Sequence, residues 1–236
     1  MKRLGLLGGM SWESSIQYER WINEAVRDRL GGTASADLVI RSFNFADIEA
    51  LQEAGDWPGA ATVLSDAAQD LQRSGAEGVV LCTNTMHRVF DDIQAAVTVP
   101  VLHIADATAS AATRAGIHRV ALLGTRYTME QDFISQRLRA AGLHVLVPDE
   151  PDRSMIHDII YAELVRGVVM AESRTRYVEA IRRLVMAGAQ GVIAGCTEIE
   201  LLVGPGDVPV AFFPTAYLHA RAAADFALGS GLRGGT

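Results

Sequence analysis

Residues 3–8 read Arg-Leu-Gly-Leu-Leu-Gly and residues 119–124 read Arg-Val-Ala-Leu-Leu-Gly, and this repeated segment decides the fold. A second repeat follows in the same order, because residues 75–80, Gly-Ala-Glu-Gly-Val-Val, match residues 188–193, Gly-Ala-Gln-Gly-Val-Ile. The copies lie 116 residues apart in the first pair (119 − 3) and 113 apart in the second (188 − 75). Similar segments in one order at similar spacing predict two copies of a single structural unit.

Short apolar runs alternate with amphipathic helical patterns along the chain. Ser11 and Asp56 stand where they can cap two of the helices. This alternation predicts an α/β fold with parallel sheets and helices on both faces. We expect two pseudo-symmetric, flavodoxin-like domains, formed by residues 1–103 plus 211–236 and by residues 104–210. Ligands of such sheets bind at the carboxyl ends of the strands, so the active site is expected in the cleft between the domains.

The composition is typical of a cytoplasmic protein. The 236 residues carry a net charge of −7, and 49% of them are apolar without forming a run long enough to span a membrane. Basic residues are scattered, so a nucleic-acid partner is not expected. The basic and apolar start of the chain is too short for a signal peptide and predicts a first buried strand. Two distant cysteines without a CxxC motif indicate reduced thiols.

The scarcity of lysine bears directly on the choice of cofactor. Lys2 is the only lysine of the chain, and an enzyme that uses pyridoxal phosphate needs a lysine in its pocket for the Schiff base. The six histidines show no close ligand spacing such as HExxH. We therefore expect neither pyridoxal phosphate nor a metal ion as cofactor.

Two strand ends carry side chains with chemistry. Residues 81–85 read Leu-Cys-Thr-Asn-Thr and residues 194–198 read Ala-Gly-Cys-Thr-Glu. Aligned without a gap, Thr83 matches Cys196, whereas a slip of one residue matches Cys82 with Cys196 and turns the side chains to the opposite face. We favour the gap-free register, in which Thr83 and Cys196 face the cleft and Cys82 is buried in the sheet.

Cys196 is the candidate side chain for chemistry, as a thiol that can approach a ligand. It follows a glycine at a strand end, and the N-terminus of the next helix is expected to lower the pKa of its thiol. Glu198 orients either a substrate ammonium group or Cys196, or it is simply a favourable charge at the start of that helix. His87 is expected to be a helix residue rather than a catalytic base.

The chain resembles the aspartate/glutamate racemase family essentially from end to end, most closely its enterobacterial-type members of broad specificity. The segments that carry the resemblance are GLLGGMSWES at 5–14, TNTMH at 83–87, ADAT at 105–108, LGTRYTMEQD at 123–132 and GCTEI at 195–199. Each motif alone is modest evidence, but several of them in order on a matching repeat are specific.

The resemblance implies two α/β domains around the active site, a homodimer, and a reaction without cofactor. It implies two bases, of which one removes the α-proton and the other protonates the opposite face. Many members have cysteine at both positions, whereas this chain has Thr83 at the first. A threonine hydroxyl gives a proton far more readily than it takes one from carbon. We therefore expect abstraction by Cys196, reprotonation on the Thr83 side, and a preference for L-aspartate or L-glutamate.

Several residues are expected to bind the amino and carboxyl groups of the substrate. Asn84, Thr85 and Thr197, with backbone N–H groups of the neighbouring helices, are candidates to hold the α-carboxylate and stabilise a carbanion. Helix capping is also a common role for asparagine and threonine, and both roles can hold together. The two glycines before Met10 allow a ligand to approach the backbone closely, although they do not form a nucleotide-binding motif.

The contacts to the substrate side chain follow from the resemblance alone. Members of the archaeal type offer an early arginine and a later lysine to the side-chain carboxylate. This chain has no arginine at 44–49, so Gln52 is a candidate neutral contact. Arg166 occupies the place of the later lysine, or it is only a helix-terminal arginine facing solvent.

Other functions on the same scaffold stay open at the level of the sequence. Hydantoin racemases, maleate isomerases and arylmalonate decarboxylases share it, although the residues at 10–13 and 84–87 favour the amino-acid racemases. A non-catalytic amino-acid-binding protein is the alternative of another class, and Thr83 in place of cysteine is its best support.

Overall fold

The computed structural model describes residues 1–229 and divides the chain into two compact units. Among the described residues, the first unit contains Met1–His103 and residues 219–229, and the second contains Ile104–Leu218. Each unit is built on a four-stranded parallel sheet, as the repeat predicts. The chain crosses between the units before α5 (Ile104–Arg114) and again within α11 (Thr215–Ala227).

The first sheet has the strand order β2-β1-β3-β4, and each neighbouring pair is parallel. This is the order of doubly wound, flavodoxin-like sheets. Its elements are β1 (Leu4–Gly8), α1 (Trp12–Leu30), β2 (Leu38–Ser42), α2 (Phe45–Glu53), α3 (Trp57–Arg73), β3 (Gly78–Leu81), the 3-10 helix η1 (Thr85–Val89), α4 (Phe90–Ala96) and β4 (Val101–Leu102).

The second sheet repeats this topology with the order β6-β5-β7-β8, again with parallel pairs. Its elements after α5 are β5 (Arg119–Gly124), α6 (Arg126–Glu130), α7 (Asp132–Ala140), β6 (His144–Leu146), α8 (Asp152–Ala162), the 3-10 helix η2 (Leu164–Arg166), α9 (Ala171–Met186), β7 (Gly191–Gly195), α10 (Ile199–Leu202) and β8 (Ala211–Pro214).

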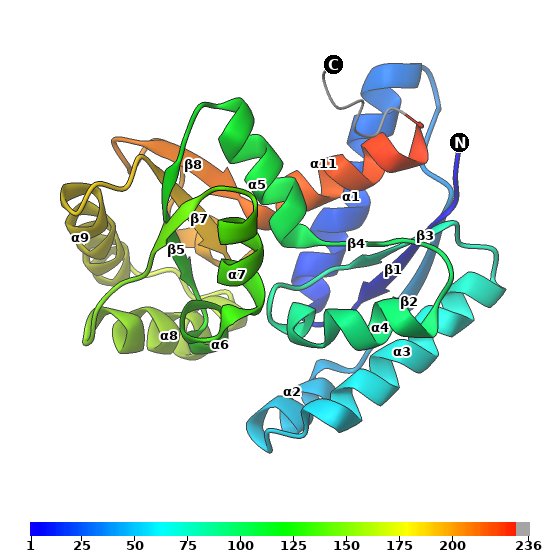
Figure 1. Ribbon diagram of the computed structural model, residues 1–236, viewed down its shortest axis with the longest axis horizontal. Coiled ribbons are helices and arrows are strands. Elements are labelled where there is room, and N and C mark those ends of the chain that lie inside the picture. Colours follow the sequence, from blue (N-terminus) through cyan, green and yellow to red (C-terminus); the bar gives the residue numbers. More distant parts are fainter. Residues whose placement is uncertain (230–236) are drawn as a thin grey trace. The chain divides into compact units, whose positions relative to one another are not determined.

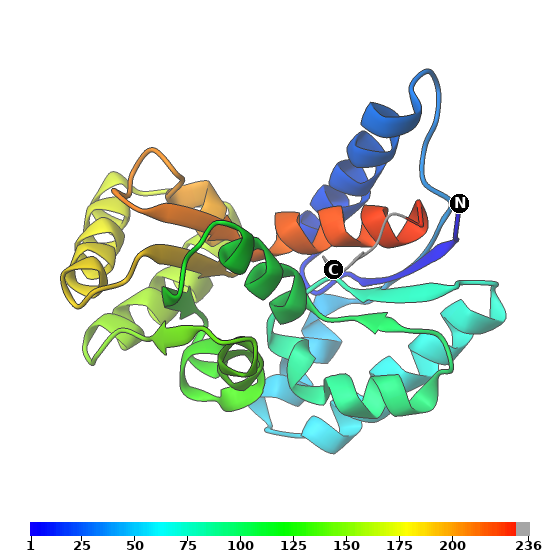
Figure 2. The ribbon, with the colours of Figure 1, turned by 45° about the horizontal axis from the view of Figure 1, so that its top comes forward.

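Helices cover both faces of each sheet. In the first unit α3 and α4 lie on one face, and α1 with the end of α11 lies on the other (Figure 1). In the second unit α8, α9 and α10 pack over one face, where they share a core cluster, and α5 and α7 pack over the other (Figure 2). Burial of apolar side chains on both faces is what the unbroken apolar strands predict.

The boundary between the units differs from the expected one, which placed residues 211–236 in the first domain. β8 pairs with β7 in the second sheet. Phe213 of β8 is buried in the same cluster as Val120 and Leu122 of β5, so this segment completes the second core. Residues 230–236, the end of the expected first domain, lie outside the described residues.

The glycines of the repeat have the same structural reason in both units. A Cβ atom on Gly78 would lie 2.5 Å from the ring of Phe226, and one on Gly191 would lie 2.6 Å from the ring of Phe213. Each glycine therefore makes room for an aromatic ring over the first residue of β3 or β7. The repeat seen in the sequence thus records a packing constraint.

Two helix starts follow the predicted capping. The Ser11 side chain accepts a hydrogen bond from the Ser14 backbone N–H at the start of α1, and Gly31 forms the C-cap of this helix. Asp56 caps α3 by accepting from the Gly59 N–H at 2.9 Å. The short helix α2 is not among the expected elements, because its nine residues carry only a weak apolar pattern.

Candidate active site

The strand pairing puts Thr83 and Cys196 at equivalent points of the two sheets. Leu7 of β1 pairs with Leu81 of β3, and Leu123 of β5 pairs with Ala194 of β7. Thr83 and Cys196 each follow their paired strand residue by two positions, at the carboxyl end of a central strand. This is the register of the gap-free alignment, and Cys82 is therefore equivalent to Gly195.

Cys82 is a core residue. Its side chain is fully buried, and its thiol lies 3.7 Å from the Val80 carbonyl oxygen. Burial raises the pKa of the Cys82 thiol far above its usual range, which keeps it protonated and unreactive. Thr83, in contrast, is only partly buried. The side chain available at the end of β3 is thus the threonine.

We call the segment that follows β3 the Thr83 turn (residues 82–87). Two histidine side chains, His87 and His103, pack at this turn. The His87 Nδ1 atom lies 2.7 Å from the Thr83 carbonyl oxygen, which can only accept, so Nδ1 carries the proton. The centre of the buried His87 ring lies 4.5 Å from the centre of the His103 ring, and the His87 ring stacks parallel to the ring of Phe90. His87 lies in η1, as expected for a helix residue, and it fixes the backbone of Thr83.

The predicted binding residues of the first unit lie around this turn. Asn84 and Thr85 follow Thr83 directly in the chain, and both are buried. Gln52 is also buried, and its Nε2 atom lies 3.0 Å from the sulfur of Met86, the residue after Thr85. Met10 is buried in the core cluster that contains Met86. Its side chain therefore supports the turn, and only its backbone remains a candidate for ligand contact.

Two glutamates, Glu198 and Glu200, belong to the corresponding segment after β7, which we call the Cys196 turn (residues 195–200). The Cys196 thiol donates to Glu198 Oε2 at 2.8 Å, and the Thr197 hydroxyl donates to the same oxygen at 3.0 Å. The Glu198 side chain makes no capping hydrogen bond to α10. Of the alternatives for Glu198, the geometry therefore favours a partner of Cys196 over a helix cap.

The expected lowering of the Cys196 pKa by a helix N-terminus is wrong. Burial raises the pKa of the thiol well above its usual value, and the nearby carboxylates of Glu198 and Glu200 raise it further. The helix that follows has only four residues, so it carries little of the dipole of a long helix. The resting thiol is therefore protonated, and an acceptor has to take its proton before it can act as a base.

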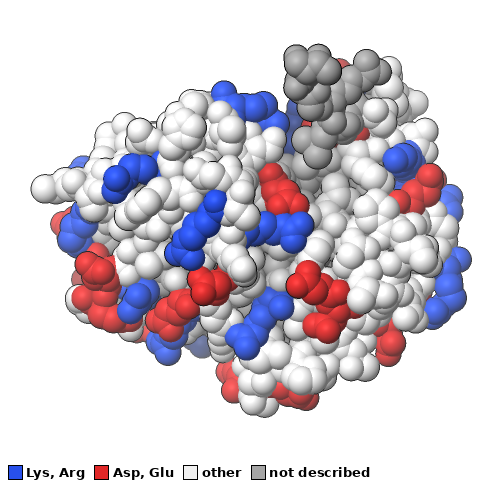
Figure 3. All heavy atoms as spheres, in the orientation of Figure 1, with Lys and Arg blue, Asp and Glu red and all other residues white. Residues whose placement is uncertain are grey.

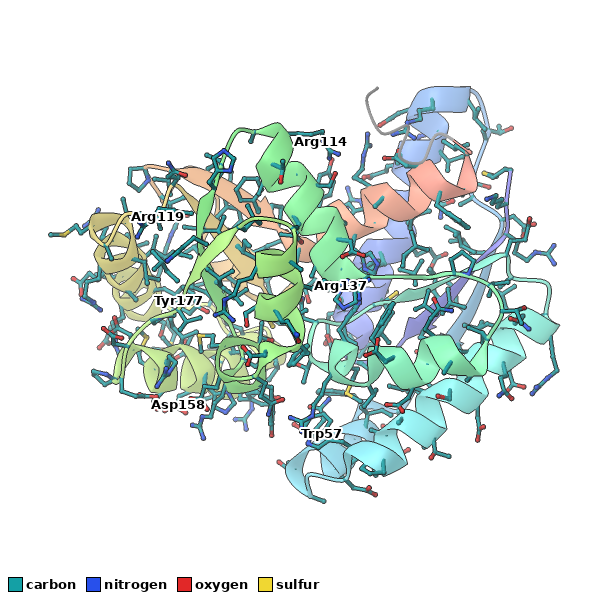
Figure 4. All side chains as sticks on the ribbon, viewed as in Figure 1. Trp57, Arg114, Arg119, Arg137, Asp158 and Tyr177 are labelled. Atoms are coloured by element: carbon teal, nitrogen blue, oxygen red, sulfur yellow. The ribbon has the colours of Figure 1, made fainter. Side chains whose placement is uncertain are left out.

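Glu200 and Tyr177 are titratable neighbours of Cys196 that the sequence analysis missed. Burial, with a smaller contribution from the Glu198 charge, raises the pKa of Glu200 to about 7. Tyr177 of α9, which is labelled in Figure 4, belongs to the core cluster against which Cys196 packs. Burial and the nearby Cys196 raise the pKa of the Tyr177 hydroxyl well above its usual value. Glu200 lies four residues after Cys196 in the sequence, which is the one signal that pointed to it.

Arg166 is exposed at the end of η2, and η2 packs against α10. Other arginines of this unit form ion pairs with aspartates. Arg137, which is labelled in Figure 4, pairs with Asp106 at 2.7 Å, and Arg183 pairs with Asp152 at 2.7 Å. Among the described residues, no ion pair is formed by Arg166. Its position agrees with both earlier interpretations, a helix-terminal arginine and a cation available to a ligand.

Basic and acidic side chains are interspersed on the face shown in Figure 3. Between residues 1 and 229, no group of three or more histidine, cysteine or acidic side chains is arranged to hold a metal ion. No helix in this part of the chain has the length and apolar character needed to cross a bilayer.

Lys2 lies over the Phe226 ring, with its Nζ atom 4.2 Å from the ring centre.

The chain is similar to known racemases in sequence and in structure. A model of the Asp/Glu/hydantoin racemase family matches residues 7–223. The crystal structure of a candidate Asp/Glu racemase from Yersinia pestis is 52% identical, with a TM-score of 0.92 over 97% of this chain and 100% of that chain. The crystal structure of an aspartate racemase homologue from Pyrococcus horikoshii OT3 is 35% identical, with a TM-score of 0.85 over 97% and 100%. RacX of Bacillus subtilis (strain 168), a broad-specificity amino-acid racemase, is 23% identical over 145 residues, which cover 58% of this chain and 59% of RacX.

Proposed function

The chain belongs to the Asp/Glu/hydantoin racemase family, and from this we propose that it racemises aspartate or glutamate without a cofactor. One observation carries the proposal. The Cys196 thiol donates a hydrogen bond to the Glu198 carboxylate at 2.8 Å. It lies at the carboxyl end of β7, at the position equivalent to that of Thr83 after β3. The repeat thus supplies one proton-transferring side chain from each unit, as inversion at carbon requires.

The first step is removal of the α-proton of the L-isomer by Cys196. The thiol transfers its own proton to Glu198, the carboxylate in hydrogen-bond contact with it, and the resulting thiolate takes the proton from Cα. The substrate ammonium group assists this ionisation, because a positive charge near the turn offsets the carboxylates that raise the pKa of Cys196. A thiolate with a raised pKa is also the stronger base toward carbon.

The carbanion that forms has to be stabilised by electrostatic contacts. We assign this role to donors around the α-carboxylate, from the Thr197 hydroxyl and the Asn84 and Thr85 side chains. Lys2 does not serve as a Schiff-base lysine in this proposal, and its position over the Phe226 ring supports that reading. Arg166 and Gln52 are the proposed contacts of the side-chain carboxylate. The acidic substrate is suggested by the names of the Yersinia and Pyrococcus proteins.

The second step returns a proton to the opposite face from the Thr83 side. A hydroxyl donates with the help of solvent, but it is a poor base for the reverse step. The equilibrium constant of a racemisation is unity, so kcat/KM is equal for the two isomers. We therefore expect the preference for the L-isomer to show in kcat and in the exchange of the α-proton with solvent.

The test is chiral chromatography of L-aspartate and L-glutamate after incubation with the protein and two cysteine variants. Cys196→Ala is expected to lose activity by a factor of about 10³ or more. Cys82→Ala, which removes the buried thiol of the other turn, is the matched control and is expected to stay active. Retained turnover in Cys196→Ala would rule out the mechanism. Turnover of neutral amino acids alone would move the substrate class toward that of RacX, and binding without any turnover would favour the non-catalytic alternative.

A further inference from the structure

Glu200 is a carboxyl group that the proposed reaction does not use. It is the second residue of α10, and its Oε1 atom is buried without a hydrogen-bond partner in the described part of the chain. A buried carboxylate oxygen with no donor is costly to keep charged. In a native protein such a group needs an explanation, either as a structural defect or as a functional element.

The surroundings of Glu200 connect it to the thiol. Glu198 lies two residues before it, and the Glu198 carboxylate accepts the hydrogen bond from the Cys196 thiol. Glu200 lies in the same tight turn as Cys196, because the Ile199 N–H donates to the Cys196 carbonyl oxygen at 3.2 Å and the Glu200 N–H donates to the Thr197 carbonyl oxygen at 3.2 Å. At this short range the Glu200 charge adds to that of Glu198 in raising the pKa of the Cys196 thiol. The three side chains of Cys196, Glu198 and Glu200 are therefore coupled. A proton gained or lost by any of them therefore changes the field at the other two.

The elements packed around α10 add few other charges. α10 packs against β7 and η2, and β7 (Gly191–Gly195) carries no titratable side chain. The titratable groups at η2 are Glu163 just before it and Arg166 at its end, where Arg166 is exposed. From α9, Tyr177 belongs to the same core cluster as Cys196. Within the described residues, no ion pair joins Glu200 to any basic group, so no cation neutralises its charge.

We propose that Glu200 controls the ionisation of Cys196 through its charge: its neutral form favours the thiolate and its carboxylate form opposes it. Because the pKa of Glu200 is raised to about 7, this control operates around neutral pH. As the pH rises through that range, Glu200 ionises and raises the pKa of the Cys196 thiol. The thiol therefore ionises less steeply with pH than an isolated cysteine. Only the consequence for turnover rests on the proposed racemase function.

The experiment measures the reactivity of the Cys196 thiol without any substrate. The intact protein is alkylated with iodoacetamide from pH 6 to 10, and the peptide that contains Cys196 is quantified by mass spectrometry. Cys82 in the same molecule reports unfolding, because it reacts only if the first core opens. Glu200→Gln is expected to alkylate at Cys196 about threefold faster or more at pH 8, with the midpoint moved to lower pH. Glu179→Gln removes an exposed carboxylate of α9 and is expected to match the wild type.

An unchanged alkylation profile in folded Glu200→Gln would overturn the proposal. The carboxyl carbons of wild-type protein labelled with ¹³C at glutamate Cδ give a second test that does not depend on the folding of a variant. We expect one glutamate to titrate close to neutral pH, and titration of every glutamate near the ordinary value of about 4.3 would also overturn the proposal. If alkylation changes as expected but no amino acid is racemised, the proposed function fails and the control of the thiol by Glu200 stands.

Discussion

The Thr83 turn and the Cys196 turn have the same place in the fold and opposite surroundings. Both follow a central strand in the same register, and each of these strands begins with a glycine under an aromatic ring. The Thr83 turn is backed by aromatic rings, and the His87 ring donates a hydrogen bond to the Thr83 carbonyl oxygen at 2.7 Å. In the Cys196 turn the thiol instead contacts the carboxylate of Glu198 at 2.8 Å.

This difference shows which level of structure the repeat preserves. Backbone register and core packing are common to the two units, because both depend on the same glycine and strand positions. The two turns differ in the residues two and four positions beyond Thr83 and Cys196, where one copy has Thr85 and His87 and the other has Glu198 and Glu200. The hydrogen bonds of the Thr83 turn thus hold one backbone position, whereas those of the Cys196 turn join the thiol to a carboxylate, which fits the proton transfer that we propose for it.

The largest effect that sharpens this comparison is expected at Glu198. Replacing Glu198 by Gln removes the acceptor of the thiol proton, so turnover of the L-isomer is expected to fall about a hundredfold. The same change removes a negative charge that raises the pKa of Cys196, so alkylation of the thiol is expected to shift to lower pH. Chiral chromatography and alkylation of one preparation measure both effects.

A decrease in turnover together with faster alkylation of the Cys196 thiol would show that the proton acceptor is lost while the thiolate still forms. Glu172→Gln, an exposed carboxylate in the first turn of α9, is the matched control and is expected to change neither. If Glu198→Gln retained full turnover, the thiol proton would have to leave by another route.

A smaller effect is expected at His87 on the other turn. His87→Phe keeps an aromatic ring but removes the donor to the Thr83 carbonyl, a buried hydrogen bond contributing about 1 kcal/mol. We expect kcat to fall about fivefold while KM changes little, because a displaced Thr83 affects proton delivery rather than binding. Steady-state kinetics on L-glutamate measure this split.

The conservative variant His87→Asn distinguishes positioning from general loss of stability. Its side-chain amide N–H can replace the Nδ1–H donor, so kcat is expected to recover toward the wild-type value. Equal loss in both variants at unchanged melting temperature would contradict a role of this hydrogen bond in placing Thr83.

The fold was predictable from the sequence because its constraints are local and repeated. The matching glycine-containing segments fix the strand register, and Ser11 and Asp56 mark helix starts by their capping chemistry. The segment around β8 was assigned to the other domain, because a short strand at a sheet edge carries no signal of its partner. Pairing between β8 and β7 depends on contacts distant in sequence.

The equivalent positions of Thr83 and Cys196 at two strand ends were also predictable, but the electrostatics around them were not. Thr83 and Cys196 follow from the repeat and from the resemblance to racemases. The sign of the Cys196 pKa shift did not follow, because it depends on burial and on the direction of the Glu198 and Glu200 side chains. The packing of the histidines His87 and His103, sixteen residues apart (103 − 87), is equally invisible in a sequence pattern.

The most direct test of the two unlike turns is proton NMR of the α-hydrogen of L- and D-glutamate in D2O. L-glutamate is expected to lose its α-proton signal faster than it inverts, because Cys196 exchanges its proton through Glu198 and can return deuterium to the same face. D-glutamate is expected to exchange no faster than it inverts, and Thr83→Cys is expected to raise its exchange about tenfold. The account would be contradicted if the wild type showed the same ratio of exchange to inversion for L- and D-glutamate, with exchange faster in both cases. The two turns would then act alike.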